Sequence, residues 1–199
     1  MAYLYNMKKF VFGLLCLLIV KAASAQDTPL QYDESNKYVY YKVTDVANTT
    51  ADTLYQRGWD FAAALTPKNK PKKGKAAYAL NTKGSFSVYT GSFLVKKEAG
   101  AFNYTLNIEA KDQKFRYKLS DFVFTPYKRD RFNNMVAQPG VEVPAEKLLS
   151  KFSAKEADEL LAELTAFCKA TGESLKRKME KVAVLHKPEP VKKVATDNW

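Results

Sequence analysis

Apolar and polar side chains alternate in three runs between residues 85 and 124, and this period of two limits the fold more than any other feature of the chain. Successive side chains of a β-strand point to opposite faces of a sheet, so such alternation predicts strands with one face in the core and the other in water. The clearest run is Phe102–Glu109, and the same pattern occurs in Ser85–Thr90 and Phe115–Ser120. The chain is therefore expected to build an antiparallel sheet.

Short connections separate these runs at Asn81–Gly84, Lys96–Gly100 and Ala110–Gln113, and each is short enough for a hairpin. With Lys75–Leu80 as a first strand, they predict an antiparallel meander of about four strands. The alternation resumes after Gly91, which predicts a bulge or bend at that glycine.

Segments with helical spacing lie before and after the meander. In the first, Thr49 or Thr50 can cap the helix through its hydroxyl, and Pro67 ends it. The second opens with a capping box, Ser153–Glu156, and continues for about 25 residues. The apolar stripes are Leu54, Tyr55, Trp59, Ala62, Ala63 and Leu65 in the first helix, and Leu160, Leu161, Leu164, Phe167, Cys168, Leu175 and Met179 in the second.

A further strand, Lys37–Val43, precedes the first helix. The predicted order is strand, helix, four-strand antiparallel meander and long C-terminal helix, which is an α+β fold with the long helix packed on a curved sheet. Residues 125–150 contain Pro126, Pro139, Gly140 and Pro144, and we expect them to form a long loop that could serve as a lid.

The two ends of the chain are expected to lie outside the folded domain. Lys8 and Lys9, the apolar run 10–20 and the small residues up to Ala25 have the pattern of a secretory signal peptide cleaved after Ala25. The apolar run is shorter than the about 20 residues of a membrane-spanning helix. We therefore expect an extended leader at 26–36, a single domain at 37–181, a basic tail at 182–199, no transmembrane segment in the mature chain, and a location in the periplasm or at the cell surface.

The sequence Leu54-Tyr55-Gln56-Arg57-Gly58-Trp59, the element order and the signal-peptide pattern together resemble domain of unknown function family 4468. Its members are exported Bacteroidetes proteins with a fold like that of the TATA-box-binding protein (TBP). The resemblance covers about Lys37 to Met179 and implies a TBP-like α+β fold and export. It implies no activity, cofactor or catalytic residue, and it does not imply DNA binding, because a fold does not fix a function.

Basic residues exceed acidic ones by 32 to 21, and removal of the three lysines within residues 1–25 leaves a net charge of +8. The excess gathers at 68–75, 128–131 and 176–193. Such clusters attract anionic lipid headgroups, acidic glycans or nucleic acid, although a solvated loop and tail would look the same in sequence. Nucleic acid is the least expected partner of an exported protein. The candidate ligand-binding residues are Lys72, Lys73, Tyr127, Lys128, Arg129 and Arg131.

Aromatic residues make up 13% of the chain, and most of them fall on the inward phases of the predicted strands, where they fill a core. Tyr41, Tyr89 and Tyr127 fall outside those phases. They are candidates to line a groove near the basic residues, or they are solitary exposed tyrosines of the ordinary kind.

Residues suited to catalysis are few. His186 is the only histidine and lies in the predicted tail, while Cys168 lies on an apolar helical stripe and is expected to be a buried thiol. Glu156, Asp158, Glu159 and Glu163 gather near the start of the last helix, where the helix dipole already favours acids. The sequence therefore predicts no catalytic residue, no metal site and no cofactor.

These observations lead to one expected function and two alternatives. The expected function is that of an exported, non-enzymatic envelope protein that binds an anionic or amphipathic ligand, or an envelope protein partner, between the sheet, the long helix and residues 125–150. One alternative is a hydrolase that uses Glu159 and Glu163. The other is a scaffold that docks on anionic lipid or glycan through its lysine-rich loop and its tail.

Overall fold

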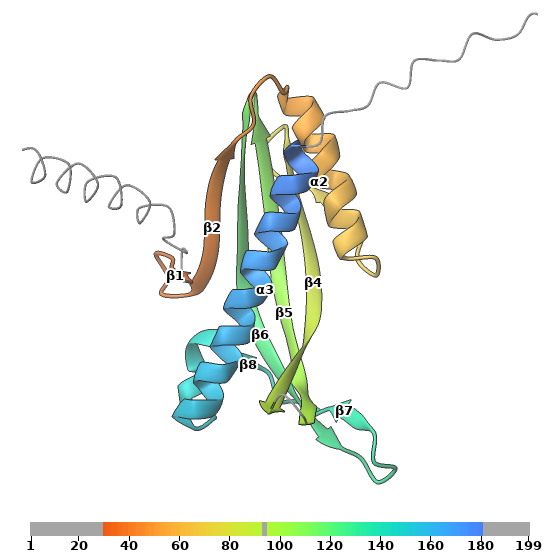
Figure 1. The fold of residues 1–199 in the computed structure, drawn as a ribbon, viewed down its shortest axis with the longest axis vertical. Coiled ribbons are helices and arrows are strands. Elements are labelled where there is room, and N and C mark those ends of the chain that lie inside the picture. Colours follow the sequence, from red (N-terminus) through yellow and green to blue (C-terminus); the bar gives the residue numbers. More distant parts are fainter. Residues whose placement is uncertain (1–29, 93–94, 181–199) are drawn as a thin grey trace, which may run out of the picture.

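An antiparallel sheet covered on one face by two helices forms the body of the protein (Figure 1). The computed structural model describes residues 30–92 and 95–180. The predicted signal peptide, the predicted tail 182–199 and His186 lie outside these residues. Within them, no helix is long and apolar enough to cross a membrane.

Three long neighbouring strands make up most of the sheet, and the full strand order is β1-β2-β6-β5-β4-β3 with every pair antiparallel. Two further short strands, β7 and β8, pair with β6. The bounds are β1 (Gln31–Tyr32), β2 (Tyr38–Asp45), β3 (Lys72–Lys73), β4 (Ala79–Ser92), β5 (Val95–Lys111), β6 (Lys114–Arg129), β7 (Met135–Ala137) and β8 (Val143–Pro144).

Both predicted helices are confirmed, and both lie on the same side of the sheet (Figure 1). Helix α2 (Ala51–Leu65) is capped by Thr50, whose hydroxyl accepts the N–H of Thr53 at 3.4 Å. Helix α3 (Ala154–Glu180) begins with the predicted capping box: the Ser153 N–H donates to the Glu156 carboxylate at 3.1 Å, and the Glu156 N–H donates to the Ser153 hydroxyl at 3.3 Å. A short 3₁₀ helix, η2 (Ala145–Ser150), precedes α3.

Two of the three predicted hairpin connections are wrong, and the meander has three long strands rather than four. Only the turn within Ala110–Gln113 is confirmed, between β5 and β6. Asn81–Gly84 lies within β4, and its glycine does not make a turn: a Cβ on Gly84 would lie 2.4 Å from the Tyr104 hydroxyl, so the residue permits an aromatic ring to cover the strand.

The segment Lys96–Gly100 is also strand, because it pairs with Val88–Gly91 across the β4–β5 ladder. The ladder shifts register between Val88 and Tyr89, where β5 carries one extra residue, Ala99. The bulge therefore lies at Val88 and Tyr89 and not at Gly91, although Gly91 itself adopts a φ of 117°. Sequence alternation could not place it, because the extra residue belongs to the partner strand.

The predicted loop over residues 125–150 is wrong as well. Strand β6 continues to Arg129, β7 and β8 pair back onto it, and η2 follows. Pro126 lies within β6 opposite Gly100, where its carbonyl accepts the N–H of Gln138, and Pro144 ends the two-residue β8. The segment is an extension of the sheet and not a free lid.

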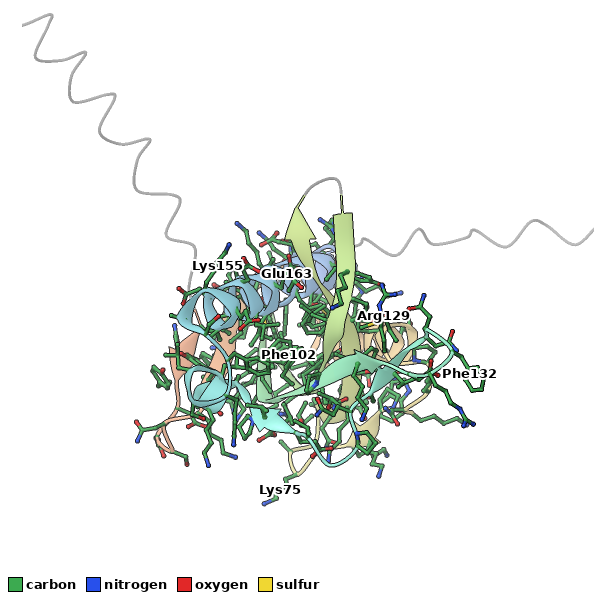
Figure 2. The ribbon with its side chains drawn as sticks, turned by 90° about the horizontal axis from the view of Figure 1, so that it is seen from below. Lys75, Phe102, Arg129, Phe132, Lys155 and Glu163 are labelled. Atoms are coloured by element: carbon green, nitrogen blue, oxygen red, sulfur yellow. The ribbon has the colours of Figure 1, made fainter. Side chains whose placement is uncertain are left out.

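Aromatic and aliphatic side chains from the sheet and both helices form one core, with Phe102 near its centre in Figure 2. The inward face of α3 is buried as predicted at Leu160, Leu164, Cys168, Leu175 and Met179. Phe167 is half-buried and stacks on Phe86 with ring centroids 3.8 Å apart. In α2, Leu54 and Ala62 are buried, but Ala63 is exposed, so it does not belong to the predicted stripe.

Glycines set how closely α3 approaches its neighbours. A Cβ on Gly172 would lie 2.0 Å from the Tyr117 hydroxyl of β6, and a Cβ on Gly58 of α2 would lie 3.1 Å from the terminal methyl of Met179. Beside Gly58, the Arg57 guanidinium donates to the backbone carbonyl of Met179 near the end of α3. The segment of α2 that carries the family resemblance therefore packs directly against the last turn of α3.

Substitution of Gly172 by alanine should destabilise the protein. In an exposed helix alanine is more favourable than glycine by about 1 kcal/mol. At Gly172, however, the new methyl group would meet the buried Tyr117 ring, and overpacking a filled core costs about 1–3 kcal/mol. Urea denaturation of Gly172→Ala should therefore show a lower midpoint, with Glu173→Ala as the exposed control on the next residue.

Part of the loss should return in the double variant Gly172→Ala/Tyr117→Phe, which removes the hydroxyl that the new methyl group meets. Equal midpoints for wild type and Gly172→Ala would contradict this account of the interface.

Candidate functional site

The face of the sheet opposite the helices carries the charged and polar side chains of four strands. Cross-strand partners share a face, and the register aligns Tyr41 with Lys118, Asn107 and Asn81 in one row. The next row contains Val43, Arg116 and Glu109. We call this side the open face.

Two adjoining depressions on the open face share Tyr41, Glu109 and Arg116 and have volumes of about 190 and 320 Å³. We call the combined region the open-face site. Its outer residues are Val43, Asn107, Lys111, Lys114 and Lys118, with Phe115 and Tyr117 reaching it from the core rows.

Arg116 is the best-oriented charge of the open-face site. Its Nε and Nη2 atoms donate to one oxygen of Glu109, at 2.9 and 2.5 Å. The hydrogen bonds that Arg116 makes to Glu109 and to Tyr41 raise the pKa of Arg116 above its ordinary value. The guanidinium is thus fixed along one edge, while a guanidinium has further N–H donors for a ligand.

The charge balance of the open-face site is strongly positive. Arg116, Lys111, Lys114 and Lys118 face a single lining carboxylate, Glu109. The site also offers apolar surface, because Tyr41 is 38% exposed and Val43 is 50% exposed. An anion that also carries an apolar part would satisfy both features.

Two other depressions of the described residues lack this charge excess. One of about 430 Å³ lies between residues 138–143 and the segment that leads into α3, with Lys151 and Glu142 as its charged lining. Another of about 370 Å³ lies farther along the open face, where Lys83 meets Asp121 and Glu142. Charge therefore distinguishes the open-face site from both of them.

The region between α3 and the sheet, where a ligand cavity was expected, is closely packed at the residues that face it. The inward residues of α3 are buried, and Tyr117 lies directly against Gly172. The depression beside residues 138–143 touches only the segment leading into α3, through Lys151 and Phe152.

The structure places the predicted ligand-binding residues in two separate groups. Lys72 and Lys73 form the edge strand β3, and Lys72 pairs with Asn81, so it ends the row that begins at Tyr41. Tyr127, Lys128 and Arg129 end β6 and pair with β7, and Arg131 follows in the turn. Tyr127 lies nine residues beyond Lys118 on β6, roughly 30 Å along the strand.

From the sequence alone, Arg116 and Lys118 are predicted only to lie on the solvent-facing side of a strand. The signal was present, because Lys114, Arg116 and Lys118 occupy alternate positions and so project from one face. Of the three off-phase tyrosines, Tyr41 lines the open-face site. Tyr89 and Tyr127 are not among its lining residues.

The candidate catalytic groups are placed apart from the open-face site. Cys168 is fully buried, and burial raises the pKa of its thiol to about 12. Glu156 serves the helix cap, where hydrogen bonds from Ser153 lower the pKa of its carboxyl group. Glu159 and Glu163 are exposed on α3. Residues 30–92 and 95–180 contain no group of three or more His, Cys, Asp or Glu side chains placed to hold a metal ion.

The antiparallel sheet with two helices on one face defines an α+β protein with a TBP-like fold. Residues 40–125 match the family described as "Domain of unknown function (DUF4468) with TBP-like fold", which confirms the family resemblance over this segment.

Solved structures agree with this fold. The chain is similar to a TBP-like protein from Parabacteroides distasonis, with a TM-score of 0.61, 12% identity, and coverage of 79% of this chain and 99% of the other. It is also similar to a DUF4468 family protein from Bacteroides ovatus, with a TM-score of 0.57, 10% identity, and coverage of 78% and 92%. At these identities the likeness shows the fold alone. A search of curated proteins finds no match.

Alkaline pH should destabilise the protein partly through Cys168. Burial raises the pKa of its thiol from 9.0 to about 12, so the folded state keeps a proton that the unfolded chain releases. This contribution is complete below about pH 9 and is lost as the pH rises toward 12. Tyr104 should add to the effect, because burial raises the pKa of its hydroxyl from 10.0 to about 12.

The urea midpoint should therefore fall between about pH 9 and about pH 12, and it should fall less steeply in Cys168→Ala, which lacks the thiol. Cys168→Ala should start from a lower midpoint at neutral pH because it leaves a small cavity, so the comparison is between slopes. Identical slopes would contradict the assignment to Cys168.

Proposed function

We propose that this protein is an exported, non-enzymatic binding module that holds an anionic ligand with an apolar part at the open-face site. The observation that carries the proposal is the oriented Arg116 guanidinium, fixed by Glu109 and Tyr41 among three lysines. Export rests on the signal-peptide pattern of residues 1–25.

The chemistry of the open-face site favours a carboxylate, phosphate or sulfate group. A guanidinium binds such groups through paired N–H donors, and neighbouring ammonium groups add attraction without demanding one geometry. The three lysines and Arg116 are exposed, so their attraction is screened by salt, and affinity should fall as ionic strength rises.

The aromatic ring of Tyr41 would contact the apolar part of the ligand. It lies in the same row as Lys118 and next to Val43, so an apolar chain attached to a bound anion would lie over β2. Binding rather than catalysis is favoured because the buried thiol of Cys168 and the exposed acids of α3 lie outside the lining of this site.

Titration of the mature chain, Gln26–Trp199, with decyl phosphate below its micelle concentration tests this function. Decyl phosphate should bind more tightly than inorganic phosphate or decanol, because only decyl phosphate engages both the cations and Tyr41. Arg116→Gln should weaken its binding by about tenfold, as expected when a charge-assisted hydrogen bond is lost. Isothermal titration calorimetry measures the change.

Arg177→Gln is the matched control, because it removes the same charge from an exposed position on α3. Tyr41→Ala should weaken decyl phosphate binding and leave the weaker phosphate binding unchanged. Equal affinities for Arg116→Gln and Arg177→Gln would show that any attraction is a property of the net charge and not of this site.

A further inference from the structure

The end of β6 and strand β7 form a hairpin that extends beyond the rest of the sheet (Figure 1). Tyr127, Lys128 and Arg129 pair with Ala137, Val136 and Met135, and residues 130–134 form the turn. Arg129 lies 13 residues from Arg116 on the same strand, roughly 40 Å along it, so this hairpin is separate from the open-face site.

The turn is held in a defined shape by Asp130. One oxygen of its carboxylate accepts the N–H groups of Phe132 and Asn134, both at 2.8 Å. The Asp130 backbone N–H donates to the Asn134 carbonyl at 2.9 Å, and Asn133 adopts a φ of 66°, which closes the turn. Phe132 is therefore placed at the tip by a network of hydrogen bonds.

Phe132 is 70% exposed, the largest exposed fraction among the large apolar side chains of the described residues. The Arg131 guanidinium lies 4.8 Å from the centre of its ring. Figure 2 shows Phe132 and Arg129 on the side of the molecule away from Lys155 of α3. The hairpin thus presents an aromatic ring at its tip with cations directly behind it.

The charge on this hairpin is positive. Lys128, Arg129 and Arg131 are exposed, whereas the one acid, Asp130, is half-buried and already engaged by backbone N–H groups. Val136, 37% exposed, pairs with Lys128 on β7 and adds apolar surface near the tip.

We propose that the β6–β7 hairpin is an anchor for an anionic lipid surface, with Phe132 entering the boundary between headgroups and acyl chains. An apolar tip followed by cations matches the order of layers at such a surface, where anionic headgroups lie outside the acyl region. The hydrogen bonds that hold the turn favour this contact, because they reduce the conformational freedom that is lost on binding. The anchor would hold the protein at a membrane while leaving the open-face site free for its ligand.

Vesicle cosedimentation of the mature chain, Gln26–Trp199, tests the anchor. Vesicles of phosphatidylcholine with about one third phosphatidylglycerol should bind the protein at least tenfold more tightly than phosphatidylcholine alone. Phe132→Ser should weaken binding to the anionic vesicles by about tenfold. Leu149→Ser is the matched control, since Leu149 is 66% exposed on η2, and it should bind like wild type.

Charge variants separate the hairpin from the general basicity of the chain. Arg129→Gln/Arg131→Gln should weaken anionic vesicle binding far more than Lys151→Gln/Lys155→Gln, which removes the same net charge from exposed positions around the start of α3. Circular dichroism should show unchanged folding in all these variants, because every altered side chain is exposed.

Insertion has its own readout. Brominated lipid should quench the fluorescence of Phe132→Trp more strongly than that of Leu149→Trp.

Absence of vesicle binding by wild type, or equal binding by Phe132→Ser and Leu149→Ser, would overturn the anchor. Loss of a cross-link to an envelope protein in Phe132→Ser, with vesicle binding unchanged, would replace the lipid surface by a protein partner. The hairpin variants should bind decyl phosphate at the open-face site as tightly as the wild type does. That result would show that the two surfaces act independently.

Discussion

The packing of α3 along one face of the sheet is the contact on which the rest of the structure depends. Gly172 lets the helix rest against Tyr117, and Gly58 of α2 leaves room for Met179 near its other end. With Arg57 bound to the last turn of α3, the two helices and the sheet share one core. That packing fills one face of the sheet and leaves the opposite face to the solvent.

The open face gains its character from the strands that form the core. Inward and outward side chains alternate over Lys114–Leu119 of β6, so Phe115, Tyr117 and Leu119 lie in the core while Lys114, Arg116 and Lys118 are exposed. Register then brings Tyr41 and Glu109 beside Arg116 from the strands on either side. The charged and aromatic lining of the open-face site is thus a by-product of the same pattern that builds the fold.

Because β6 is long, the open-face site and the β6–β7 hairpin lie far apart on the same strand. Its first half carries the open-face site, and its far end forms the hairpin that presents Phe132. Both surfaces are basic, but they differ in apolar content and shape: one is a depression with Tyr41 in its wall, and the other is a projecting tip. This difference is the physical reason for proposing a dissolved ligand for the first surface and a lipid surface for the second.

The sequence by itself determined the α+β class, both helices with their caps, the main strand runs and the burial of Cys168, because these follow from local periodicity and from hydrogen bonds within a few residues. Tertiary structure decided that Gly84 lies within a strand beneath Tyr104, that the extra residue near Val88 belongs to β5, and that residues 125–150 pair back onto β6. It also decided that Lys72 and Arg129 lie far apart while Tyr41, Glu109 and Arg116 meet. Those outcomes depend on which strands become neighbours and in what register, and a period of two carries no information about either.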